Sequence, residues 1–287
     1  MRRSLIILFL FSYSFYFVLA QSKMPGQEEL NSFFESKTLV VKEGGFGSFY
    51  NAYIKEAVEK EWNLTPFEFV KVDDFNEKMT DSTYSFLVLT NTHFEKDKAG
   101  ADYNFINLLL GKQGVKSITE MPEMGSLPLS YSDNEDDDYS YKLSVMIEFI
   151  QKRAELMKGR PDYLSMRYLK YYNKNTPGIK LKTLLVLEKN LASEIGTIDK
   201  IKKNYDYDIK IVTEEELEEA IAGKEDYLFL HCVMPEEKGK QGWTFKLVFG
   251  IADGRLYYYN KHTISSKKPA GLLKSDLKKM NSKNKIF

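Results

Sequence analysis

The chain has 287 residues, of which 43% are hydrophobic and 14% aromatic, which is enough apolar material for the cores of two domains of ordinary size. Basic and acidic residues number 41 each, so the formal net charge is zero and the composition provides no basic field that would attract nucleic acid. The single cysteine, Cys232, excludes an intrachain disulfide, and its place inside an apolar run indicates a small core residue rather than a nucleophile.

Residues 1–20 have the pattern of a secretory signal peptide. Two arginines precede an apolar run over Leu5–Leu19, and Ala20 ends a small-residue cleavage pattern before Gln21. The alternative is an uncleaved membrane anchor, which is disfavoured because Ser12 and Ser14 interrupt a run already short for a span. We expect a periplasmic or secreted protein with no transmembrane segment after signal cleavage.

Residues 21–159 predict a first α/β unit. A lead-in helix is expected over 25–35, a strand over Thr38–Lys42, and a helix with apolar residues at helical spacing over Tyr50–Trp62. An acidic segment over 130–141 then interrupts all periodicity. It lacks the glycine and closing glutamate spacing of a calcium loop, so we expect a solvated loop.

A glycine-rich connection joins the first strand of this unit to its helix. Gly44, Gly45, Gly47 and Ser48 precede the helix N-terminus, where backbone N–H groups can cradle an anionic group. The motif is neither a full G-x-G-x-x-G nor a P-loop, because no Lys-Ser/Thr pair follows it. The alternative interpretation is a plain tight connection in which Ser48 is the helix N-cap.

A second α/β unit is expected over residues 160–287, where the sequence predicts a strand, a short helix, another strand and a hairpin. Thr213 and Glu216 form a capping box at the start of the helix. The run Tyr227–Val233 is apolar on both alternating faces, as in a strand that is buried on both sides. Asp253 and Gly254 stand between two strand-like runs and predict a type I′ turn, in which both central residues have positive φ.

The two units look like copies of one another. Phe67–Lys112 aligns without a gap on Ile209–Gly254, and Lys37–Val41 matches Lys182–Val186 before them. Element order, register and spacing agree although identity is low, which indicates an internal duplication rather than a chance likeness of two α/β units. We therefore predict an α/β protein of two similar mixed-sheet units, each with helices packed on its sheet.

The second unit also resembles a known family. Its T-E-E-E-L-E-E-A-I helix from Thr213, its D-Y-L-F-L strand from Asp226 and its hairpin from Trp243 resemble the periplasmic α/β domain of the TolB amino terminus and of CsgG-type proteins. The resemblance implies an exported binding or assembly domain. The chain departs from both proteins by its tandem pair, with no β-propeller as in TolB and no membrane-inserting strands or lipobox as in CsgG, so neither the propeller nor the pore function is implied.

The hairpin carries a candidate interaction surface. Its aromatic residues are Trp243, Tyr257, Tyr258 and Tyr259, and successive strand residues point to opposite faces, so at least one set of tyrosines faces outward. The alternative is that the inward set belongs to the core and the outward set covers neighbouring helices.

The sequence contains no catalytic motif of the common kinds. His93, His231 and His262 show no nucleophile or metal-ligand spacing, and G-x-S-x-G, H-E-x-x-H and C-x-x-C do not occur. We therefore predict a non-enzymatic bacterial envelope protein, without cofactor or metal, that acts as a binding or assembly module for an envelope protein or a surface polymer. The alternatives are a small anionic-ligand-binding protein that uses the Gly44–Gly47 loop and a carboxylate-dependent hydrolase.

Overall fold

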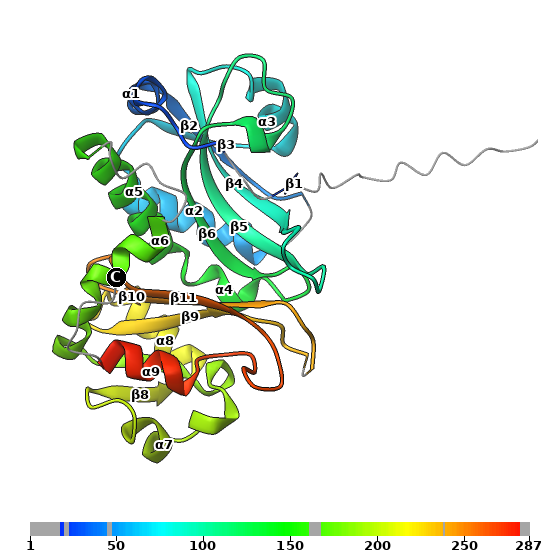
Figure 1. Ribbon diagram of the computed structural model, residues 1–287. Coiled ribbons are helices and arrows are strands. Elements are labelled where there is room, and N and C mark those ends of the chain that lie inside the picture. Colours follow the sequence, from blue (N-terminus) through cyan, green and yellow to red (C-terminus); the bar gives the residue numbers. More distant parts are fainter. Residues whose placement is uncertain (1–17, 20–22, 45–47, 161–167, 238, 282–287) are drawn as a thin grey trace, which may run out of the picture.

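The computed structural model describes residues 18–19, 23–44, 48–160, 168–237 and 239–281 (Figure 1). The predicted signal peptide lies outside these residues except for Val18–Leu19 (β1), which pair in parallel with Thr92 and His93. The described residues form two mixed sheets, one above the other in Figure 1, each with helices packed against it. The predicted α/β class with two similar units is confirmed.

The first sheet has the strand order β3-β2-β4-β5-β6, with β1 beside the far end of β4. Its strands are β2 (Lys37–Val41), β3 (Phe67–Val70), β4 (Tyr84–His93), β5 (Asp102–Leu110) and β6 (Glu123–Tyr131). Strand β2 pairs in parallel with both β3 and β4, whereas β5 and β6 are added antiparallel.

The second sheet repeats this topology strand for strand, in the order β8-β7-β9-β10-β11. Its strands are β7 (Leu184–Leu187), β8 (Ile209–Val212), β9 (Leu228–Val233), β10 (Trp243–Gly250) and β11 (Leu256–Thr263). Strand β7 pairs in parallel with β8 and β9, and β10 and β11 are antiparallel, as in the first sheet. The gapless sequence alignment brings β3 onto β8, and these two strands occupy the same edge of their sheets.

The helices connect the strands in matching places. The first unit contains α1 (Gln27–Glu35), α2 (Phe49–Glu61), α3 (Val72–Lys78), α4 (Asp137–Ser140), α5 (Leu143–Gly159) and the 3-10 turn η1 (Ile118–Glu120). The second unit contains α6 (Tyr168–Tyr171), α7 (Ile198–Lys202), α8 (Glu214–Ala222), α9 (Lys274–Asn281) and the 3-10 segments η3 (Tyr172–Leu181), η4 (Glu188–Asn190) and η5 (Ser193–Ile195).

One hydrophobic core joins the two sheets. Ile54 of α2 and Ile150 of α5 belong to the same cluster of buried side chains as Leu217 of α8 and Phe229 of β9. The other face of the first sheet is covered by α3, and the other face of the second sheet by α7 and α9. The two units therefore meet through a shared apolar layer.

Two local features predicted from the sequence, a helix cap and a hairpin turn, have different outcomes in the structure. Thr213 and Glu216 form the expected capping box. The predicted type I′ turn is wrong, because the connection is a four-residue loop closed between Gly250 and Arg255, in which only Gly254 has a positive φ. The Asp253 carboxylate accepts hydrogen bonds from the Arg255 N–H at 3.1 Å and the Tyr257 hydroxyl at 2.6 Å, and these bonds hold Asp253 in an ordinary conformation.

Candidate functional site

The start of α2, where the sequence predicts an anion cradle, already receives a carboxylate of the same chain. Asp136 Oδ2 accepts from the Tyr50 N–H at 3.0 Å and lies 3.2 Å from Ser48 Oγ. Ser48 is the N-cap of the helix and accepts from the Asn51 N–H. Gly44 is exposed, whereas Gly45 and Gly47 lie outside the described residues. An external anion at this helix terminus would therefore compete with Asp136.

The acidic segment that contains Asp136 bridges the two units. Asp133 pairs with Lys240, Asn134 donates to the Met234 carbonyl at 3.3 Å, and Asp138 pairs with Lys189 at 2.6 Å. The expected solvated loop over 130–141 is only partly present. The segment begins in β6 and contains the helix α4, and its two ends are buried because Tyr131 and Tyr139 pack into the core. The polar residues between them connect the first unit to three places in the second.

The candidate aromatic surface lies largely inside the molecule. Tyr257 is 6% exposed and Tyr258 is fully buried, while Trp243 and Tyr259 are half-buried. The Trp243 ring lies 4.8 Å from that of Phe94, on the β4–β5 connection of the first unit. Without a rearrangement, a partner would reach only Trp243 and Tyr259.

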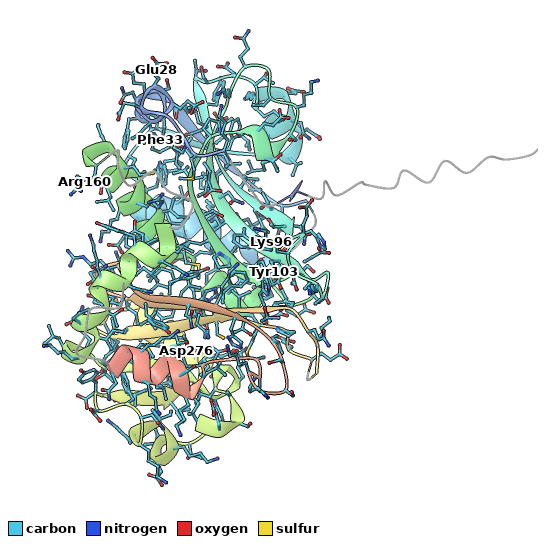
Figure 2. All side chains as sticks on the ribbon, viewed as in Figure 1. Glu28, Phe33, Lys96, Tyr103, Arg160 and Asp276 are labelled. Atoms are coloured by element: carbon cyan, nitrogen blue, oxygen red, sulfur yellow. The ribbon has the colours of Figure 1, made fainter. Side chains whose placement is uncertain are left out.

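Trp243 is also fixed by its main chain and by a cation. Its N–H donates to the Tyr103 hydroxyl and its carbonyl accepts from the Tyr131 hydroxyl, both at 2.8 Å. The Lys261 ammonium lies 3.5 Å from the centre of the indole ring, which is a cation–π contact. Because Tyr103 (labelled in Figure 2) and Tyr131 come from the first sheet, this cluster holds the two units together.

The three histidines all have contacts within the chain. His231 is buried with Nε2 3.1 Å from the Pro128 carbonyl oxygen, and burial lowers its pKa to about 3. His93 lies 3.1 Å from Asp102. Burial likewise raises the pKa of the neighbouring Cys232 thiol to about 12, so this thiol is protonated at neutral pH.

The third histidine, His262, belongs to a buried polar network under the second sheet. Its Nδ1 lies 2.9 Å from Lys246 Nζ, and Lys246 is paired at 2.7 Å with Asp276 of α9 (Figure 2). The Tyr258 hydroxyl and the Asn260 amide each donate to Asp276 at 2.7 Å. Both charged side chains are completely buried and well supplied with partners, so this network anchors α9 to the second sheet, with His262 half-buried at its edge.

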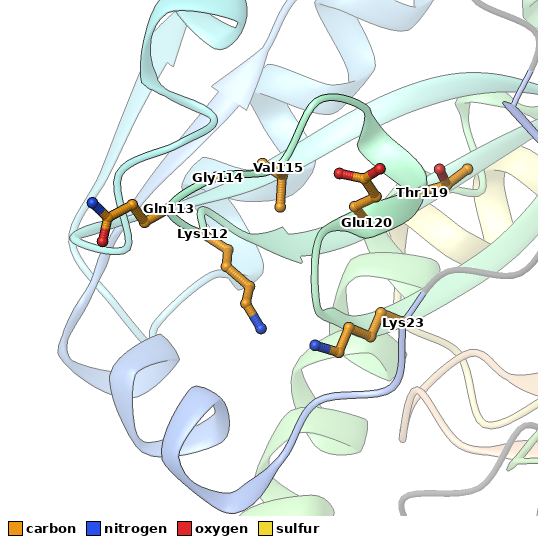
Figure 3. Close-up of a pocket in the computed structure, with 7 residues that line it drawn as sticks. All are labelled: Lys23, Lys112, Gln113, Gly114, Val115, Thr119 and Glu120. Atoms are coloured by element: carbon orange, nitrogen blue, oxygen red, sulfur yellow. The ribbon is translucent and has the colours of Figure 1, made fainter.

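A pocket of about 410 Å³ opens on the first unit, beside its N-terminal segment and the β5–β6 connection (Figure 3). Its wall is made by Lys23, Lys112, Gln113, Gly114, Val115, Thr119 and Glu120. The segment before α1 is fixed where the Lys23 carbonyl accepts from the Glu123 N–H at 2.9 Å. Lys112 lies two residues beyond the end of β5, and its N–H donates to the Met79 carbonyl at 3.0 Å.

Two ammonium groups meet in this pocket. The side chains of Lys23 and Lys112 point toward one another (Figure 3), and Lys112 pairs with Glu29 of α1. The neighbouring Lys112 amine lowers the pKa of Lys23, first through a hydrogen bond and then through its charge. Burial acts to raise the pKa of Glu29, but the bonds from Lys112 and the Gly26 N–H outweigh it and lower the pKa. Two amines thus lie close together at the pocket wall, and Lys112 is the one that pairs with Glu29; such an arrangement can receive an oxyanion.

Sequence reasoning missed this pocket. Lys23 and Lys112 lie in different segments, and neither belongs to a motif. The only local signal was Gly114, which forms the turn after β5 with φ of +83°. A chain with so many lysines gives no reason to choose these two before the fold brings them together.

None of the helices in the described ranges is long and apolar enough to cross a membrane. Among the same residues, no group of three or more His, Cys, Asp or Glu side chains is placed to hold a metal ion. Compared with known proteins, the chain matches no family model, no curated protein and no solved structure.

Proposed function

We propose that the protein is an exported, non-enzymatic bacterial envelope protein that works as a binding module, and that the pocket of Lys23 and Lys112 holds an anionic group of its ligand. The observation that carries this proposal is that the side chains of Lys23 and Lys112 point toward one another at the wall of an open pocket, where Lys112 also pairs with Glu29 (Figure 3). An added oxyanion would relieve the repulsion between the two amines.

The surroundings of the chemically active side chains support binding rather than catalysis. His231 and Cys232 lie in a strand of the second sheet, with pKa values displaced by burial away from neutral pH. His262 is part of the buried network of Lys246 and Asp276. These groups therefore serve the packing of the second unit.

Export rests on the pattern of residues 1–20, and the resemblance to TolB- and CsgG-type domains favours the same compartment. N-terminal sequencing of the protein recovered from the periplasm or medium is expected to begin at Gln21. Recovery of a chain that still begins at Met1 in the cytoplasm would contradict export.

The binding proposal can be tested by titrating inorganic phosphate into the purified protein and following it by calorimetry. We expect a dissociation constant on the order of 1 mM, which corresponds to about 4 kcal/mol. Lys23→Met should weaken binding by about twofold to fivefold, the range of one exposed ion pair. The control is Lys42→Met, because Lys42 is exposed and follows β2 at the end opposite to the pocket. Equal affinity of the two variants would refute the site.

A further inference from the structure

We infer that the natural ligand of this pocket is a zwitterion, a free amino acid or a short peptide with both termini free. This inference rests on the proposed function and adds the second half of the ligand. Its basis is that the pocket carries opposite charges on different sides: Lys23 and Lys112 on one, and the carboxylate of Glu120 on another (Figure 3).

Glu120 is held in place by the short turn that contains it. Its Oε2 accepts from the Lys116 N–H at 2.8 Å, across the 3-10 turn η1. This bond fixes the carboxylate at the rim and directs one oxygen toward the backbone. The other oxygen, Oε1, is the atom that a ligand ammonium group would meet. Thr119, on the same turn, also lines the pocket, and its hydroxyl lies 2.8 Å from that of Ser117.

The charge balance favours a zwitterion over a simple anion. The two lysines are matched by Glu29, which pairs with Lys112, and by Glu120, so that these four groups sum to zero. A dianion would gain from the two amines but would be repelled by both carboxylates. A zwitterion can place its carboxylate at the amines and its ammonium group at Glu120, and it brings no net charge into a neutral pocket.

The remaining wall suits a small aliphatic body. Val115 is 9% exposed and contributes an apolar surface between the charged sides. At Gly114 a side chain would meet no atom within 4 Å, so the turn leaves open space above the pocket. The volume of about 410 Å³ lies in the range of small-molecule sites.

The experiment compares three forms of one dipeptide by calorimetry: glycylglycine, its N-acetyl derivative and its C-terminal amide. Glycylglycine should bind most tightly, and each blocked form should bind about twofold to fivefold more weakly, because each lacks one exposed ion pair. Glu120→Gln should abolish the difference between glycylglycine and the N-acetyl form. Lys23→Met should abolish the difference between glycylglycine and the amide, while Lys42→Met should change neither difference.

Two results would overturn the inference, and they are distinguishable. If the N-acetyl form binds as tightly as glycylglycine and Lys23→Met weakens both, the ligand is a plain anion and the proposed function survives. If no dipeptide form binds and inorganic phosphate does not bind either, while circular dichroism shows a folded protein, both the zwitterion and the binding function are rejected.

Discussion

The helix that joins the first two parallel strands of each sheet packs on the inner face of one unit and on the outer face of the other. In the first unit it is α2, which packs in the core shared by both sheets; in the second it is α7, which packs on the outer face. The helices that follow the last strand differ in the same way, since α5 lies inside and α9 outside. The helix that joins the second and third strands of each unit shows the reverse. Before β4, α3 lies on the outer face, whereas α8, before β9, lies in the shared core. The units therefore stack through non-equivalent faces.

This stacking explains the different lengths and compositions of equivalent helices. α5 is 17 residues long and has buried side chains around most of its circumference, because it lies between two sheets. α9 is 8 residues long, and lysines occupy its solvent side. The same topology thus occurs twice in one chain, and the length and surface residues of each helix differ according to whether it packs between the sheets or against solvent.

The largest effect is expected from the buried ion pair that anchors α9 to the second sheet. Lys246→Met leaves the Asp276 carboxylate buried without its cation, which should cost about 3–5 kcal/mol of the free energy of unfolding. Urea denaturation measures this cost. The double variant Lys246→Met/Asp276→Leu should recover much of it, and a single-variant loss below about 1 kcal/mol would mean that the outer helix does not depend on this pair.

A cavity in the inner helix should affect both units. Ile150 of α5 is fully buried, and Ile150→Ala is expected to cost about 2–5 kcal/mol. Amide hydrogen exchange should become faster in β4 and in β9, since both strands contribute to the shared core. Leu277→Ala on α9 is the matched control, with faster exchange expected in the second sheet. A change confined to the first sheet in Ile150→Ala would show that the units are independent.

A smaller, pH-dependent effect is expected where the acidic segment meets the second unit. The pKa of Glu236 is raised to about 7. The largest cause is a hydrogen bond with Asp138, followed by burial and by the charge of Asp138, and Lys189 opposes part of this rise. A carboxyl group with a raised pKa favours the folded state when protonated. Its contribution is therefore complete below the ordinary pKa near 4.5 and is lost as the pH rises through 7.

Because Glu236 is mostly exposed, this contribution should be at most about 1 kcal/mol. Free energies of unfolding measured at pH 5, 6, 7 and 8 should decline less steeply in Glu236→Gln, which retains a hydrogen-bond donor for Asp138. Other groups face this pair, namely Glu135, Lys142 and Lys189, and none is changed in the variant. Parallel curves for the two proteins would refute the assignment.

The smallest effect is expected at Lys189, which follows β7 and pairs with both Asp138 and Glu214. All three side chains are partly exposed, so Lys189→Met should cost only a few tenths of a kcal/mol up to about 1 kcal/mol. The difference from the unaltered protein should shrink in 0.5 M salt, because exposed ion pairs are screened. A cost that is unchanged by salt would point to lost packing of the lysine stem instead.

The candidate sites were less predictable than the fold, and the reason is physical. For Ser48 the sequence offered an anion-binding role and, as the alternative, a helix N-cap; the structure confirms the N-cap, which could be predicted because capping depends on groups within one helical turn. That Asp136 occupies the same helix terminus could not be foreseen, because it arrives from a distant segment whose several carboxylates look alike in sequence. Lys23 and Lys112 posed the same difficulty. The candidate surface at Trp243 was chosen for its aromatic content, which cannot distinguish an outward face from the contact between units.

The sequence alone determined the elements of this protein and their repetition, since periodic burial, capping and alternation act over a few residues and are written into each segment. It thereby specified the α/β class and two units of the same order. The tertiary structure decided which faces of the units meet, because both faces of each sheet are apolar and local patterns do not distinguish them. It also decided which charges are neighbours, since the energy of a charge depends on distance in space, and only the folded chain sets that distance.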